Sequence, residues 1–152
     1  MRIRPLVPPD IDNIAALLGT LAVHFIVHDS PPEAAATFLQ LQDAAAIRAN
    51  IAAGMAYHVA EIDGALAGFI GVRDRRHIYH LFVDQARHRR GVARALWQAA
   101  RDAAGHAGPF TVNSSTYAVP AYEALGFVRT APMQVQNGIA FHPMRMEGGA
   151  HA

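Results

Sequence analysis

The stretch from His77 to Leu96 reads HIYHLFVDQARHRRGVARAL and changes from an apolar segment to an arginine-rich one. Its first seven residues, His77–Val83, are rich in β-branched and aromatic side chains and predict a strand. After the strand, apolar residues recur at helical spacing on one face, at Val92, Leu96, Ala99 and Ala103. The stretch therefore predicts a strand, a short loop and a helix that begins at Gly91.

The loop and helix start carry the densest positive charge in the chain, with arginines at 87, 89, 90 and 94 and no acidic residue from Gln85 through Arg101. Free N–H groups at a helix start attract anions, and glycine lets a phosphate approach the backbone closely. The pattern favours a pyrophosphate-binding turn, and a solvated, arginine-rich helix start is the alternative. It is neither a nucleotide P-loop nor a Gly-x-Gly-x-x-Gly turn.

The residues before this stretch predict a strand at Ile3–Val7 and two helices. The first helix opens at Asp10 and runs to Phe25 on one apolar face. The second begins with capping-box spacing at Ser30–Glu33 and continues to Gly54. Two strands follow, Tyr57–Ile62 and Leu66–Val72, joined by the hairpin turn Asp63-Gly64.

The residues after the stretch predict a short strand, Phe110–Val112, and a short helix, Val119–Leu125. Two final strands, Val128–Val135 and Ile139–Met146, are joined by Asn137-Gly138. The order is β-α-α-β-β-β-α-β-α-β-β, which indicates an α/β (α+β) fold with a mixed sheet. We expect a single domain at residues 1–147 and a short tail at residues 148–152.

Composition narrows the function classes. The chain has 152 residues, of which 52% are hydrophobic and 16% charged; 13 basic residues, all arginine, balance 12 acidic ones. The net charge of +1 argues against nucleic acid as a partner. No cysteine is present, which excludes disulfides and a cysteine nucleophile. No signal or membrane segment is recognised, so we expect a soluble cytoplasmic protein.

Two motifs resemble those of the GNAT superfamily of N-acetyltransferases. That family's acetyl-CoA motif reads Gln/Arg-x-x-Gly-x-Gly/Ala after a strand ending Leu-x-Val, and His88–Ala93 follows Leu81–Val83 here. Residues 113–127, NSSTYAVPAYEALGF, resemble its second signature, in which a tyrosine precedes a Leu-Gly-Phe turn. The resemblance covers nearly the whole chain, although residues 10–54 match in pattern only. It implies a mostly antiparallel, seven-stranded sheet flanked by about four helices.

The resemblance also implies acetyl-CoA as cosubstrate. The residues that it places against acetyl-CoA are Leu81, Phe82, Val83, His88, Arg89, Arg90, Gly91, Val92, Ala93, Arg94 and Asn113. His88 stands where the family usually has Gln or Arg, which would make its phosphate contact pH-dependent. Asn113 has a second interpretation as a turn residue.

The implied reaction is acetyl transfer to a primary amine of a small molecule or peptide, by direct attack through a tetrahedral intermediate. Tyr122 matches the family's general acid, and a core aromatic beside Phe127 is the alternative. His77 matches the position of a general base, with His80 and Glu61 as fallbacks and a water chain as the rival. Strand alternation predicts that His77 and Tyr79 share a face with Leu81 and Val83, while Ile78, His80 and Phe82 point the other way.

The acceptor amine is expected between the first two helices and the last hairpin, where the candidates are Phe25, His28 and Tyr79. Asp29 and Glu33 could attract a cationic amine there, although a turn and a helix cap explain them better. His24 and His28 are spaced like metal ligands but lack a third, so no metal is expected. The alternative function is a non-catalytic acyl-CoA-binding module. A homodimer is compatible with the sequence, which fixes no interface.

Overall fold

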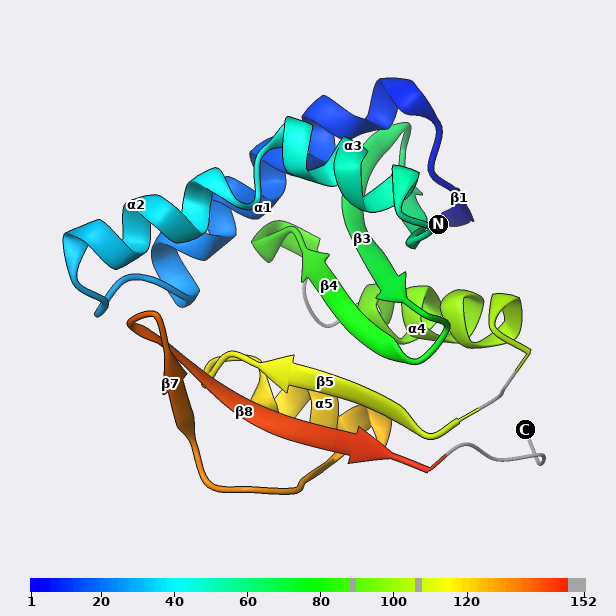
Figure 1. Cartoon of the computed structure of the whole chain (residues 1–152). Coiled ribbons are helices and arrows are strands. Elements are labelled where there is room, and N and C mark those ends of the chain that lie inside the picture. Colours follow the sequence, from blue (N-terminus) through cyan, green and yellow to red (C-terminus); the bar gives the residue numbers. More distant parts are fainter. Residues whose placement is uncertain (88–89, 106–107, 148–152) are drawn as a thin grey trace.

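The structure is a computed structural model that describes residues 1–87, 90–105 and 108–147. Figure 1 shows its arrangement. The helices are α1 (Ile11–Phe25), α2 (Pro32–Gln40), α3 (Ala44–Ala52), α4 (Val92–Ala103) and α5 (Val119–Leu125). The strands are β1 (Arg2–Pro5), β2 (Ala56–Ile62), β3 (Ala65–Arg73), β4 (His77–Val83), β5 (Phe110–Ser114), β6 (Val128–Arg129), β7 (Gln134–Gln136) and β8 (Ile139–Met146).

The strands form one mixed sheet in the order β1-β2-β3-β4-β5-β8-β6, and β7 pairs with β8. Every pairing is antiparallel except that of β4 with β5. The predicted fold class is therefore confirmed. The strand predicted at Val128–Val135 is two short strands, β6 and β7, because Pro132 between them has no N–H for the ladder.

Helices cover both faces of the sheet. On one face, α4 and α5 pack on a core that includes Ile78, Leu96 and Phe127. On the other face, α1 and α3 pack on a second core that includes Ile14, Ile47 and Phe69. Gly68 of β3 allows α4 to approach closely, since a Cβ there would lie 2.7 Å from the Phe82 carbonyl oxygen and 3.3 Å from Leu96 Cδ1.

The helix predicted from Ser30 to Gly54 is wrong in two respects. It is broken at residues 41–43 into α2 and α3, and Asp43 begins the second helix by accepting a hydrogen bond from the Ala46 N–H at 2.9 Å. The predicted Ser30 capping box is absent too, because the residue that precedes α2 is Pro31. An aspartate inside a helical pattern competes for backbone N–H groups, which explains the break.

The hairpin turns follow the prediction. Asp63-Gly64 joins β2 to β3, and Asn137-Gly138 joins β7 to β8. In both turns the two residues have positive φ, at 53° and 79°, as a tight hairpin turn requires. The second hairpin packs against α2, since a Cβ on Gly138 would lie 2.6 Å from the Cβ of Ala34.

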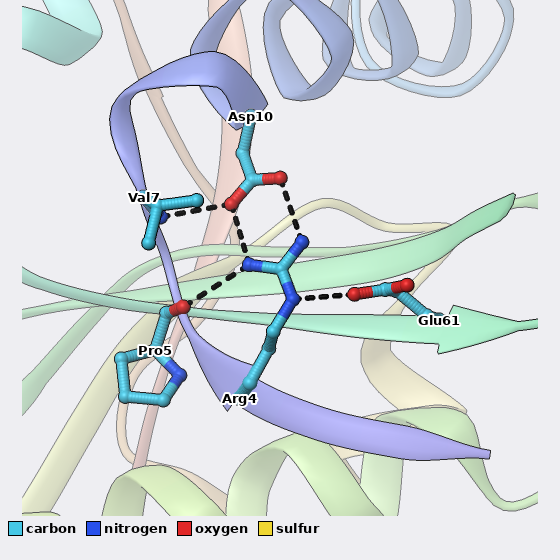
Figure 2. Close-up of polar contacts among 5 residues, drawn as sticks. All are labelled: Arg4, Pro5, Val7, Asp10 and Glu61. Carbon is cyan, nitrogen blue, oxygen red and sulfur yellow. Dashed lines mark hydrogen bonds and ion pairs between the residues drawn. The ribbon is translucent and has the colours of Figure 1, made fainter. Parts of the chain in front are cut away.

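The Arg4 side chain links β1 to Asp10, the residue before α1 (Figure 2). Its guanidinium donates to both carboxylate oxygens of Asp10, at 2.7 and 2.9 Å, and it is ion-paired with Glu61 on β2. Asp10 also accepts from the Val7 N–H at 2.8 Å. The hydrogen bonds from Arg4 hold the pKa of Asp10 below its usual range, and that from Val7 adds to the effect. Among the described residues, no helix is long and apolar enough to cross a bilayer.

Candidate active site

A cleft of about 980 Å³ opens where β4 and β5 separate. The two strands are in register for two residue pairs, His77 with Thr111 and Ile78 with Val112, and then diverge (Figure 1). The cleft is lined from both sides of the sheet: by α4 and α5 on one side, and by α1, α2 and the β7–β8 hairpin on the other. A ligand in the gap can therefore reach both sides of the sheet.

A bulge in β4 changes which side chains share a face. Gly71 of β3 is opposite His80 and Val72 is opposite Ile78, so Tyr79 is the extra residue. As a result Ile78 joins Leu81 and Val83 in the core under α4, while Phe82 packs in the core under α1. The predicted alternation is wrong here, because it assumed an unbroken strand and put Ile78 on the face of Phe82.

The helix start has the shape of an anion site. Gly91 precedes α4 in the left-handed region, with φ of 74°, and no atom lies within 4 Å of the position that a Cβ would take. Gly91, Val92, Ala93 and Arg94 all line the cleft, together with Arg87. The N–H groups of the first turn of this 12-residue helix have no partner in the helix itself.

The arginines around this turn differ in position. Arg94 lines the cleft, and its guanidinium donates to the Ala124 carbonyl oxygen at 3.0 Å, which ties α4 to α5. Arg90 is exposed and lies outside the cleft lining. His88 and Arg89, also expected at the cofactor, lie outside the described residues. Asn113, at the end of β5, is exposed and lines the cleft.

Tyr122 lies on α5, where it lines the cleft and packs edge-to-face on Phe127, with ring centroids 5.7 Å apart. The side chain is 6% exposed. Burial raises the pKa of the Tyr122 phenol, so the hydroxyl keeps its proton at neutral pH. The structure thus unites the two interpretations of the sequence: the ring belongs to the core, and the residue borders the cleft.

His77 opens β4 beside Thr111 of β5, with 2.8 Å between His77 Nδ1 and Thr111 Oγ1. The residue is partly buried and lines the cleft. Burial lowers the pKa of His77, and the charge of Arg73 lowers it further, so the imidazole is neutral at pH 7. A neutral imidazole whose Nδ1 is held by a hydroxyl can take up a proton at Nε2.

The two fallback bases are placed differently. Glu61 lies outside the cleft lining and is ion-paired with Arg4 (Figure 2). His80 borders the cleft, but both of its ring nitrogens are engaged: Nδ1 lies 3.0 Å from the Tyr57 hydroxyl and Nε2 lies 2.6 Å from Gln42 Oε1. Burial lowers the pKa of His80 to about 3. Neither residue is placed to accept a proton from an amine.

Gln42 is a cleft residue that the sequence interpretation missed. It lies in the break between α2 and α3, and its side chain is 8% exposed. The signal that could have found it is Asp43, because a capping residue there begins a new helix and turns the preceding residue out of the helical pattern.

The residues expected around the acceptor amine are only partly brought together. Phe25 and Tyr79 line the cleft, and Phe25 stacks on Tyr117 with ring centroids 4.0 Å apart. His28 is exposed and outside the lining, as are Asp29 and Glu33. Among the described residues, no three His, Asp or Glu side chains gather as a metal site would require.

Comparisons with known proteins agree with this geometry. The structure is similar to that of a GCN5-related N-acetyltransferase from Rhodopseudomonas palustris, with 25% identity, a TM-score of 0.79 and coverage of 96% of this chain and 94% of that one. It also shares its fold with the PaiA N-acetyltransferase of Thermoplasma acidophilum in complex with coenzyme A (12% identity, TM-score 0.78, coverage 96% and 98%). The structure of YncA from Salmonella typhimurium with acetyl-CoA also shares the fold, with 21% identity, a TM-score of 0.69 and coverage of 100% of this chain and 96% of that one.

The sequence comparisons give the family. A search of curated proteins found no match. The family model described as the acetyltransferase (GNAT) domain matches residues 26–148, a range that contains β4, α4 and α5. Since this match spans well over half of the chain, the protein belongs to the GNAT family of acetyltransferases.

Proposed function

We propose that this protein transfers the acetyl group of acetyl-CoA to a primary amine, which attacks the thioester directly. The observation that carries the proposal is the continuity of one cleft, from the start of α4 through the gap between β4 and β5 to the α1–α2 side. Such a cleft can hold a phosphorylated thioester on one side of the sheet and an amine on the other.

The helix start and the strand edge fit the two ends of acetyl-CoA. The pyrophosphate would bind the N–H groups of Gly91, Val92 and Ala93, with the charge of Arg87 nearby. The pantetheine arm would lie along β4, where Leu81, Phe82 and Val83 line the gap left by β5. An extended chain with amide groups can bind there as an added strand would.

Tyr122 is proposed as the general acid. When the amine nitrogen bonds to the carbonyl carbon and the carbon–sulfur bond breaks, the leaving thiolate needs a proton. Tyr122 is protonated at neutral pH because burial raises the pKa of its phenol. Its position in the cleft allows that proton to pass to the sulfur, and the protein regains it from solvent after product release.

His77 is proposed as the base that removes the proton of the amine. The amine must be neutral to attack, and an aliphatic amine in water is mostly protonated at pH 7. His77 is neutral there because burial lowers its pKa, and Thr111 fixes its orientation. The rival is a chain of waters without a dedicated base, and the pH profile of kcat in His77→Gln separates the two mechanisms.

Two measurements test the function. Calorimetric titration with acetyl-CoA should give saturable binding, and titration in high salt should weaken it, since phosphates are bound partly by charge. A panel of amines with acetyl-CoA should then release free thiol, which is read without interference because the chain has no cysteine. No binding at millimolar acetyl-CoA would overturn the proposal. Binding without acetyl transfer to any amine would favour the non-catalytic module.

A further inference from the structure

The α1–α2 side of the cleft is largely apolar. Its walls carry Phe25 and Ile26 from the C-terminal end of α1, Phe38 and Leu41 from α2 and its C-terminal end, and Ile139 and Phe141 from β8. None of the described residues that line the cleft is an aspartate or glutamate. A polycationic acceptor would leave several charges without partners on such a surface, which costs free energy.

Helix α2 has its apolar side turned to this cleft. No residue of α2 is buried, although Ala34, Thr37 and Phe38 recur at helical spacing and all line the cleft. Leu41, one turn further along the same side, is 61% exposed. Phe38 is only partly buried against the core under α1, and Leu41 is exposed, so an apolar ligand would cover apolar surface that the protein leaves accessible to water.

Gln42 places an amide in this largely apolar surface. Gln42 lines the cleft with its side chain 8% exposed, and its Oε1 accepts a hydrogen bond from His80 Nε2 at 2.6 Å. Gln42 Nε2 makes no hydrogen bond within residues 1–87, 90–105 and 108–147. Nε2 is not among the described side-chain atoms that are fully buried without a partner, so a ligand in the cleft can reach this amide and accept a hydrogen bond from it.

The orientation of the Gln42 amide follows from the residues behind it. Asn50 Nδ2 donates to the Tyr57 hydroxyl at 3.2 Å. The hydroxyl proton then goes to His80 Nδ1 at 3.0 Å in preference to Met55 Sδ, a weaker acceptor 4.0 Å away. This leaves the proton of the neutral imidazole on Nε2, which donates to Gln42 Oε1. With its oxygen bound to His80, the amide keeps its two N–H groups for the cleft.

We propose that the acceptor is a primary amine on an apolar, aromatic or branched aliphatic body that also carries a neutral carbonyl oxygen, and that Gln42 Nε2 donates to this oxygen. The amide of an apolar amino acid has this chemistry. Polyamines and aminosugars do not, since charged amines or hydroxyls recur along their whole length and leave no extended apolar body. The proposal rests on the proposed acetyl transfer and adds the class of acceptor to it.

The test compares phenylalaninamide with phenethylamine, which lacks the carbonyl, and with spermidine, at saturating acetyl-CoA. Rates are expressed per neutral amine, because the α-amino group of phenylalaninamide is a much weaker base than phenethylamine. On that scale we expect kcat/KM to be at least about tenfold higher for phenylalaninamide than for either amine, since the hydrogen bond to Gln42 Nε2 is lost with phenethylamine. Acetyl transfer with spermidine as the preferred acceptor would overturn this inference and leave the proposed function standing. Absence of acetyl-CoA binding would instead overturn the function itself.

Two substitutions of Gln42 locate the contact. Gln42→Leu should remove the advantage of phenylalaninamide over phenethylamine, and equal losses with both amines would contradict the role of Gln42. Gln42→Glu keeps an oxygen for His80 but replaces the donor with a carboxylate, so it should lower kcat/KM for phenylalaninamide and raise it for spermidine. Gln40→Leu, on the exposed side of α2 outside the cleft lining, is the matched control and should change neither.

Binding gives a readout that is independent of turnover. With CoA present, calorimetric titration of N-acetylphenylalaninamide, the expected product, should show an affinity at least about tenfold lower for Gln42→Leu than for Gln40→Leu. Equal affinities would overturn the contact even if phenylalaninamide is acetylated. Thermal denaturation shows whether each variant is folded. If Gln42→Leu does not fold, Gln42→Glu tests the same N–H donor, because its carboxylate keeps an oxygen for the hydrogen bond to His80.

Discussion

His80 Nε2 lies 2.6 Å from Gln42 Oε1, and this contact joins the central strand β4 to the break between α2 and α3. The two residues are 38 positions apart in the sequence and both are buried. With the imidazole neutral and protonated on Nε2, Gln42 Oε1 is the acceptor, and this inferred orientation leaves the amide N–H groups for the cleft. We therefore propose that His80, which the sequence offered as a base, positions Gln42 instead.

This arrangement makes folding stability depend on pH. Burial lowers the pKa of His80 to about 3, against about 6.5 in an unfolded chain. The unfolded state therefore binds more protons between these values, so the stabilising contribution is complete above pH 6.5 and is lost as the pH falls toward 3. At pH 5 the loss is on the order of 2 kcal/mol.

Urea unfolding at pH 7 and pH 5 measures this loss. His58 and His77 contribute in the same direction, since burial lowers the pKa of each. His80→Gln has no titrating group at position 80, so its free energy of unfolding should fall less between the two pH values than that of the original protein. An equal fall in both proteins would show that His80 is not held neutral by the fold.

Tyr122→Phe separates chemistry from binding. The phenylalanine ring keeps the contact with Phe127 while the proton for the leaving thiolate is lost. We expect kcat to fall by roughly 10²-fold or more, the usual size of a general acid's contribution, with the dissociation constant of acetyl-CoA unchanged within about twofold. Full kcat in the variant, measured as thiol release with the best acceptor, would remove Tyr122 from the mechanism.

His77→Gln tests the base through the pH profile of kcat. Because burial lowers the pKa of His77, the neutral form persists below pH 6.5, and kcat should decline only in more acidic solution, where His77 is protonated. The variant should be slower throughout and should lose this acidic limb. Thr111→Val, which removes the partner of Nδ1, should reduce kcat less and keep the limb. An unchanged limb in His77→Gln would favour the water chain.

The sequence predicts most of the fold because its signals are local. The two hairpin turns and the glycine before α4 each act within a few residues, and the structure has each in its expected place. Besides the division of residues 128–135 into β6 and β7, two features were not predicted. The bulge at Tyr79 depends on the pairing of β3 with β4, which strand alternation does not contain. The break at Asp43 places Gln42 against His80, and that contact joins residues 38 positions apart.

The candidate site was predictable to the same extent. Tyr122, Gly91 and His77 are predicted as site residues from motif position, and all three line one cleft. His28 was chosen for its place after the first helix, yet its side chain is exposed and lies outside the cleft. The packing of α2 decides which side chains after α1 point into the cleft. Apolar spacing within one segment of sequence does not determine this packing.

Gly138 and Gly64 provide a matched pair for testing the wall of the cleft. Each is the second residue of a hairpin turn with φ of 79°, so alanine is strained at both, at a cost of roughly 1–2 kcal/mol. They differ in their surroundings: a Cβ on Gly64 meets no atom within 4 Å, whereas one on Gly138 lies 2.6 Å from the Cβ of Ala34 on α2. Neither the turn nor α2 can absorb so close a contact without moving.

Gly64→Ala should therefore lower stability without altering kinetics, because the β2–β3 turn lies outside the cleft. Gly138→Ala should lower stability further and push the β7–β8 hairpin away from α2, which widens the acceptor side of the cleft. We expect the KM of the acceptor to rise several-fold in this variant while the dissociation constant of acetyl-CoA stays the same. Equal kinetics in the two variants would mean that the contact between Gly138 and Ala34 does not shape the acceptor site.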